Sequence, residues 1–197
     1  RTADRAGPPN VLLRNTGQGF ALSEHNADVQ IWRNTFQSTW ADYDQDGDQD
    51  VYVANDFSTN NLLRNDGPAG FTDVSQECRA EDIGFGMGAS WGDYDNDGSQ
   101  DLYVSNMFSK AGRRIVAQVA ELDPALAQMA QGNSLLDWDG EKFERVSGLE
   151  EPQLMVEMGG WSWGSQFIDV DNDCYLDIIA LSGHYTSPAE IAIPVDT

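Results

Sequence analysis

The stretch Trp91-Gly-Asp-Tyr-Asp-Asn-Asp-Gly-Ser-Gln-Asp101, followed by Leu102-Tyr-Val104, decides the fold. The same arrangement occurs as Trp40-Ala-Asp-Tyr-Asp-Gln-Asp-Gly-Asp-Gln-Asp50 and, with an altered start and centre, as Phe167-Ile-Asp-Val-Asp-Asn-Asp-Cys-Tyr-Leu-Asp177. In each copy an apolar run leads into a tight acidic loop, and a second apolar run follows. This pattern predicts a β-hairpin, with two antiparallel strands joined by the acidic loop.

A second type of hairpin alternates with the first. It reads Asn10-Val-Leu-Leu-Arg-Asn15 before Phe20, then Asn61-Leu-Leu-Arg-Asn65 before Phe71, then Asn133-Ser-Leu-Leu136 before Phe143. Four strands in a period of roughly 50 residues is typical of a propeller blade. The sequence therefore predicts an all-β fold of β-propeller blades, each with four antiparallel strands. A sandwich of unrelated hairpins is the alternative, but it gives no reason for an acidic loop to recur at the same strand junction.

Counting the expected strands gives about three blades' worth in a single repeat domain over residues 1–197. The parts are a half blade at 10–24, a blade at 36–76, a blade at 86–147 and a half blade at 161–181. A short helical insertion is expected at about 110–131, because apolar residues recur there at helical spacing.

Closed propellers have about four to eight blades. We therefore expect the chain to be a fragment of a larger propeller, or to associate with other chains through its complementary half blades. Such association gives a closed oligomer, or a fibre if the rotation does not close. A compact ring closed by one chain is the third alternative.

Each acidic loop carries carboxylates at positions 1, 3, 5 and 9, and position 7 offers a backbone carbonyl. Hard oxygen ligands in this number suit Ca²⁺ better than Mg²⁺, and zinc is disfavoured because His and Cys do not cluster at its usual spacing. About three calcium ions are expected, one per loop, with weaker binding where Cys174 replaces the turn glycine. The predicted metal-binding residues are Asp42, Asp44, Asp46, Asp48, Asp50, Asp93, Asp95, Asp97, Ser99, Asp101, Asp169, Asp171, Asp173, Tyr175 and Asp177.

An EF-hand shares the opening of this loop pattern, but it requires a Glu ligand at position 12 and flanking helices. Position 12 is Val53, Val104 or Ala180, and each lies in a β-type run. The EF-hand is therefore excluded, and plain acidic surface turns remain the alternative to metal sites.

Three stretches resemble the FG-GAP/VCBS-repeat proteins, in the branch that carries the ASPIC/UnbV domain and includes the cartilage acidic proteins. They are Trp91-Gly-Asp-Tyr-Asp-Asn-Asp-Gly98, Asp101-Leu-Tyr-Val-Ser-Asn-Met-Phe108 and Trp161-Ser-Trp-Gly-Ser-Gln-Phe167. The resemblance extends over almost the whole chain, from about residue 10 to 184. It implies calcium-binding propeller blades like those of integrin α-chains, an extracellular or periplasmic setting, and a role in adhesion or assembly.

The composition limits the partners. With 11 Lys and Arg against 33 Asp and Glu, the formal charge is -22, which argues against nucleic-acid and anionic-membrane partners. No run approaches the roughly 18 apolar residues of a membrane span. The expected partners are calcium and either another protein or a second copy of the chain. Cys78 and Cys174 are placed on opposite faces of the predicted propeller, so no disulfide between them is expected.

Two further functions are alternatives to this one. Gly160-Trp-Ser-Trp-Gly164 fits the Gly-x-Ser-x-Gly of a nucleophile elbow, and Asp177 and His184 follow in hydrolase order. That motif requires a helix after Ser162, and none is expected, so we predict that the chain is not an enzyme. A polysaccharide-binding module is the other alternative, because exposed Trp and Tyr rings could stack on sugars.

Overall fold

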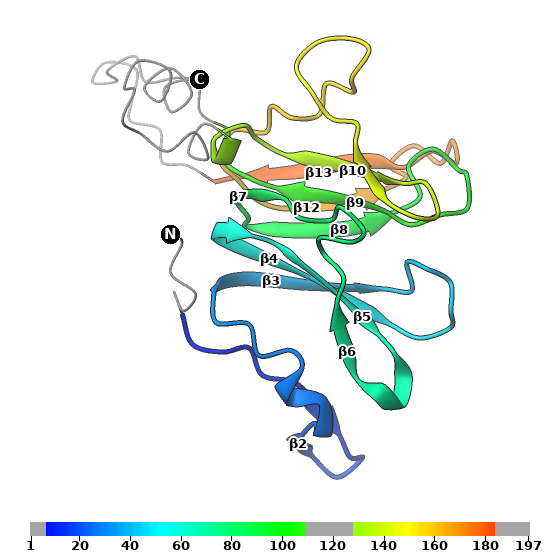
Figure 1. The fold of residues 1–197 in the computed structure, drawn as a ribbon. Coiled ribbons are helices and arrows are strands. Elements are labelled where there is room, and N and C mark those ends of the chain that lie inside the picture. Colours follow the sequence, from blue (N-terminus) through cyan, green and yellow to red (C-terminus); the bar gives the residue numbers. More distant parts are fainter. Residues whose placement is uncertain (1–6, 109–127, 184–197) are drawn as a thin grey trace.

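The computed structural model describes residues 7–108 and 128–183 (Figure 1). The predicted fold class is confirmed: this part of the chain is all-β, with antiparallel sheets of four and five strands and no closed barrel among them. Almost all of the predicted helical insertion at 110–131 lies outside the described residues. No helix in the described part is long and apolar enough to cross a membrane.

The strands form successive sheets along the chain. The first is a hairpin of β1 (Leu13–Asn15) and β2 (Phe20–Leu22). The second has the order β3 (Asn34–Ala41), β4 (Asp50–Thr59), β5 (Asn61–Asn65) and β6 (Phe71–Asp73), and β7 (Ile83–Phe85) pairs with β4. The third has β8 (Gly88–Gly92), β9 (Asp101–Ser105), β10 (Ser134–Trp138) and β11 (Phe143–Arg145). The last is a hairpin of β12 (Ser162–Ile168) and β13 (Asp177–Ser182).

Equivalent strands of the two larger sheets share one register. Val51 lies opposite Leu63 in the β4–β5 pair, and Leu102 lies opposite Leu136 in the β9–β10 pair. A slip of one residue would turn each apolar set to the other face, so the repeat in the sequence is also a repeat in three dimensions. We call β3–β4, β8–β9 and β12–β13 the inner hairpins, and β1–β2, β5–β6 and β10–β11 the outer hairpins.

Each sheet packs against the next through alternate residues of its strands. The largest apolar cluster lies between the β3–β6 and β8–β11 sheets, where the rings of Tyr43 and Trp91 stack 6.2 Å apart. Tyr103 and Phe167 lie in the cluster between the β8–β11 sheet and the last hairpin. Gly92 permits this second contact, since a Cβ there would lie 2.6 Å from Phe167 Cγ. The stack brings the acidic loops, which join the strands of each inner hairpin, next to one another.

Two short 3₁₀ helices lie outside the sheets: η1 (Glu24–Ala27) follows β2, and η2 (Gly67–Ala69) lies between β5 and β6. Val29, just after η1, packs with Val51, Val53 and Leu63 in a third apolar cluster. Leu12, just before β1, also packs there, so the segments on either side of the first hairpin lie against the β3–β6 sheet. Cys78 is buried and Cys174 is exposed, and both are free thiols.

Candidate metal centres

Three carboxylates converge in each acidic loop. They come from loop positions 1, 3 and 9, and within each set the ligand oxygens lie within 4.8 Å of one another. The sets are Asp42, Asp44 and Asp50; Asp93, Asp95 and Asp101; and Asp169, Asp171 and Asp177. Each loop joins the two strands of an inner hairpin, so the antiparallel pairing of those strands brings positions 1 and 9 together.

A tight turn at positions 4 to 6 folds each loop back on itself. Position 4 is left-handed in all three loops, with φ of 61° at Gln45, 63° at Asn96 and 63° at Asn172. Position 6 is also left-handed, and Cys174 adopts this conformation at φ 73° without being glycine. A non-glycine residue in the left-handed region is strained. At position 6 the third loop therefore carries a backbone strain that Gly47 and Gly98 avoid in the other two loops.

The position 1 carboxylate holds the turn in place. Oδ2 of Asp42 accepts a hydrogen bond from Gly47 N at 3.1 Å, and Oδ2 of Asp169 accepts one from Cys174 N at 3.0 Å. In the first loop, Oδ1 of Asp42 and Oδ1 of Asp48 are buried without a hydrogen-bond partner. Buried acceptors normally have partners, so these two oxygens fit a site that takes a cation.

Position 9 connects each of the first two loops to the neighbouring outer hairpin. Asp50 is fully buried, and its carboxylate accepts hydrogen bonds from Tyr43 N at 3.3 Å and from Asn65 N, at the end of β5, at 2.8 Å. Asp101 is also fully buried, and it accepts from Tyr94 N at 3.2 Å and from Trp138 N, at the end of β10, at 3.0 Å.

Asp177 differs from its two counterparts. It is exposed, and in the described part of the chain it accepts a backbone hydrogen bond from Val170 N alone, at 3.1 Å. The amide that a neighbouring outer strand supplies to Asp50 and Asp101 has no counterpart at the third loop, because β13 pairs only with β12 among the described strands.

Burial of these carboxylates makes their negative charge unfavourable. Desolvation raises the pKa of Asp50 to about 6, even though two backbone amides stabilise its charged form. Desolvation also raises the pKa of Asp101, and the nearby Asp137 adds to the effect. The pKa of Asp44 is raised by desolvation and by the charge of Asp46. A divalent cation would neutralise this charge, since two carboxylates 4 Å apart repel by about 4 kcal/mol at an effective dielectric near 20.

The predicted ligands at position 5 lie outside the three converging sets. Oδ1 of Asp46, Asp97 and Asp173 instead accepts the backbone N–H of position 7, at 3.1, 2.7 and 2.9 Å respectively. The acceptors of these N–H groups are thus local, as in an Asx turn. The backbone carbonyls of Asp48, Ser99 and Tyr175 at position 7 stay predicted ligands.

Two hydrogen bonds that link adjacent loops could not be foreseen from the sequence. Gln45 Nε2 donates to the carbonyl oxygen of Gly98 at 2.8 Å, and Asn96 Nδ2 donates to that of Cys174 at 3.0 Å. In both cases position 4 of one loop reaches position 6 of the next. The signal in the sequence is a side-chain amide at position 4 of every loop, with Asn172 as the third.

Ser162, the predicted nucleophile of the hydrolase alternative, is a buried structural residue. It is fully buried at the start of β12, where Oγ donates to Gly159 O and accepts from Asn133 Nδ2, both at 3.0 Å. Its predicted partner His184 lies outside the described residues. The strand β12 follows Ser162, whereas a nucleophile elbow leads into a helix.

The comparison with protein families bears on the first two loops. Residues 42–104 match the model of the FG-GAP-like repeat. The matched segment begins at position 1 of the first loop and extends through the second loop and most of β9. It supports the predicted resemblance at the level of the FG-GAP repeat, and the ASPIC/UnbV branch stays a prediction. No curated protein matches the chain.

Proposed function

We propose that this chain is a calcium-binding repeat module in which bound ions hold the acidic loops closed and stiffen the stack of sheets. The observation that carries the proposal is the convergence of three carboxylates at equivalent positions of three loops. The match to the FG-GAP-like repeat over the first two loops supports it. About three ions are expected, one per loop.

The donor set favours calcium over other metals. Each cluster consists of carboxylates, with backbone carbonyls nearby at position 7, and hard oxygen donors of this kind suit Ca²⁺. Asp42, Asp44 and Asp50 would hold the ion of the first loop, together with the unpartnered Oδ1 of Asp48 or its backbone carbonyl. When bound, the ion supplies positive charge at a point where the chain gathers negative charge.

The proposed role is structural, in adhesion or assembly, in an extracellular or periplasmic setting. The FG-GAP repeat supports a repeat domain of the propeller type. The calcium concentrations outside cells suit sites with dissociation constants of about 10⁻⁴–10⁻³ M, as in other extracellular modules. Polysaccharide binding stays the alternative, supported by exposed rings such as Trp163.

Calcium addition tests the proposal directly. At a free concentration near 100 times Kd, each site should raise the free energy of unfolding by about 2.7 kcal/mol. The measurement is thermal unfolding of metal-stripped protein in chelator, in magnesium and in calcium up to tens of millimolar. The double variant Asp93→Asn/Asp95→Asn should lose part of the calcium-specific shift. Glu144→Gln, an exposed carboxylate of β11, should retain all of it. A folded, metal-free protein with no calcium-specific shift contradicts the proposal.

The bonds between adjacent loops should couple their calcium sites. Asn96→Gly removes the amide that reaches Cys174 O and keeps the left-handed backbone at position 4. One hydrogen bond contributes about 0.5–1.5 kcal/mol, so we expect calcium affinity of the weakest site to fall by about two- to tenfold. Asn172→Gly is the matched control, since no inter-loop bond from its amide is present in the described chain. Calcium titration calorimetry that gives identical isotherms for the two variants argues against coupling.

A further inference from the structure

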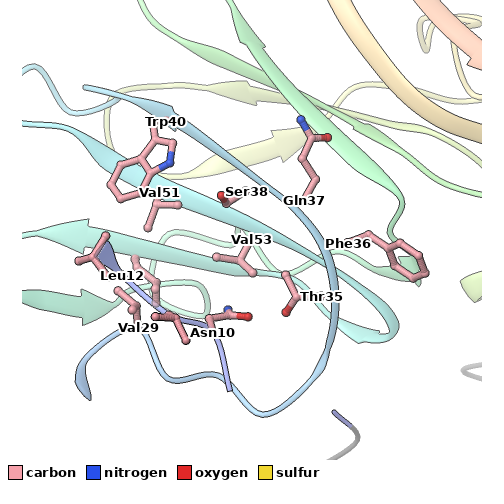
Figure 2. A pocket seen from close by; sticks show the side chains of 12 residues that line it. Asn10, Leu12, Val29, Thr35, Phe36, Gln37, Ser38, Trp40, Val51 and Val53 are labelled. Carbon is pink, nitrogen blue, oxygen red and sulfur yellow. The ribbon is translucent and has the colours of Figure 1, made fainter. Parts of the chain in front are cut away.

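An open groove lies between the segment that leads into β1 and the β3–β6 sheet (Figure 2). Its volume is about 260 Å³, and its walls include Leu12, Val29, Trp40, Val51 and Val53. Figure 2 shows the Trp40 ring close to Val51, on the inner hairpin of this sheet. Trp40 is 43% exposed, which leaves a large apolar ring partly uncovered beside a groove.

The next sheet shows what covers a tryptophan at this position. Trp91 of β8 corresponds to Trp40 of β3, one residue before the last residue of the strand. Its ring packs on Tyr43 and Tyr52 of the preceding inner hairpin, with centroids 6.2 Å away in both cases. The groove at Trp40 is thus the place where an inner hairpin of a preceding sheet would lie.

The described chain contains one inner hairpin whose corresponding face is uncovered, β12–β13. Val170 and Ile179 occupy the positions of Tyr43 and Tyr52 in the acidic loop and in the strand after it. The tyrosines are 2% and 0% exposed, whereas Val170 is 68% and Ile179 49% exposed. The opposite face of β13 is already used, because Ile178 packs against the β8–β11 sheet.

The free edges of the two end hairpins are complementary as well. In the described chain β13 pairs with β12 alone and β1 with β2 alone. If β1 took the place that β5 takes beside β4, Leu13 would lie opposite Ile178, as Leu63 lies opposite Val51. Leu13 is 54% exposed and Leu63 is 1% exposed. In this register Asn15 N would donate a hydrogen bond to the Asp177 carboxylate. It would thus take the role that Asn65 N has toward Asp50.

We propose that a second copy of this chain inserts its β12–β13 hairpin into the groove at Trp40 and pairs its β13 with β1. The shared sheet then has the order β12–β13–β1–β2, which is that of β3–β4–β5–β6. Figure 1 shows β2 and β13 at opposite ends of the stack, so a hairpin from another copy is better placed than the chain's own. Counted over the described residues, two whole sheets from each copy and two shared sheets give six blades, within the range of closed propellers. A head-to-tail contact forms a ring if its rotation closes, and in the proposed dimer a two-fold rotation repeats the contact at both ends.

Mass in solution tests the proposal. Light scattering on purified chain in calcium should give twice the 21.7 kDa of one copy. Ile179→Glu places a charge in the proposed contact. Because Ile179 is exposed in the single chain, the change should leave the fold intact and give monomers. Met155→Glu changes another exposed apolar residue, which lies outside the contact, and it should leave the dimer intact. A wild-type monomer at high concentration overturns the proposal, as does a fibre, or a dimer that Ile179→Glu leaves unchanged.

A cysteine pair tests the register. Facing residues of antiparallel strands lie at Cα distances that permit a disulfide. In a Cys174→Ser background, mixing chains that carry Leu13→Cys with chains that carry Ile178→Cys should give a disulfide-linked dimer under mild oxidation. The pair Leu12→Cys with Ile178→Cys is the control, shifted by one residue, and should link at least tenfold more slowly. Equal rates for the two pairs overturn the register.

Discussion

Replacing Asp101 with alanine should lower the free energy of unfolding by about 2–4 kcal/mol, even without calcium. The carboxylate is fully buried and accepts the backbone N–H groups of Tyr94 and Trp138. Alanine leaves both buried donors unpaired, at a cost of about 1–3 kcal/mol each, and loss of a buried charge offsets part of that. The effect is large because Trp138 N lies in β10, so the hydrogen bond connects the acidic loop to the outer hairpin and to the aromatic core.

Two further variants separate this structural role from a role in binding metal. Asp101→Asn keeps a carbonyl oxygen that can accept one of the two amides, so it should retain most of the calcium-free stability. It removes a ligand charge, so it should abolish the calcium response of the second loop. Asp97→Asn is the control, because Asp97 is exposed and lies outside the converging set. Urea unfolding in chelator and in calcium measures both effects, and equal losses in chelator for Asp101→Ala and Asp97→Asn contradict the structural role.

Much of the fold could be predicted because each repeat contains short sequence patterns that identify its strands. The acidic loop and the Leu-Leu pair of the outer hairpins each identify a strand junction within a few residues, and antiparallel neighbours in sequence usually pair. The sequence did not show that the carboxylate at position 9 accepts a backbone hydrogen bond from the neighbouring outer strand. Asn65 and Asp50 are 15 residues apart, and only the pairing of β4 with β5 brings the amide to the carboxylate.

The candidate site was predictable in its residues and less so in its geometry. Positions 1, 3 and 9 converge, whereas position 5 caps a backbone amide two residues ahead. The spacing alone does not separate these two roles, because an Asp can serve either a cation or a nearby N–H. The hydrogen bond from Gln45 to Gly98 depends on how adjacent sheets stack. The sequence of one loop carries no information about its distance from the next loop.

The calcium-free protein should be more stable at pH 5 than at pH 8. An unfolded Asp titrates near pH 3.9, whereas burial raises the pKa of Asp50 to about 6 in the folded chain and also raises that of Asp101. Between these values the folded state holds more protons than the unfolded state, so stability falls as pH rises through the folded pKa values. One pKa unit corresponds to about 1.4 kcal/mol, so Asp50 alone accounts for a loss of about 1–1.5 kcal/mol between pH 5 and pH 8.

Calcium should reverse this pH dependence. An ion in the loop takes the place of the proton as the neutralising charge, and protons compete with it for the same oxygens. The stabilisation by calcium should therefore be larger at pH 8 than at pH 5. Asp66, whose pKa is lowered by Thr72 and Arg64, acts below about pH 4 and does not interfere in this range. Melting temperatures from pH 4.5 to 8.5, in chelator and in calcium, measure both slopes. Asp50→Asn should flatten the slope in chelator, and a calcium-free stability that rises from pH 5 to 8 would show that ionising the buried carboxylates carries no cost.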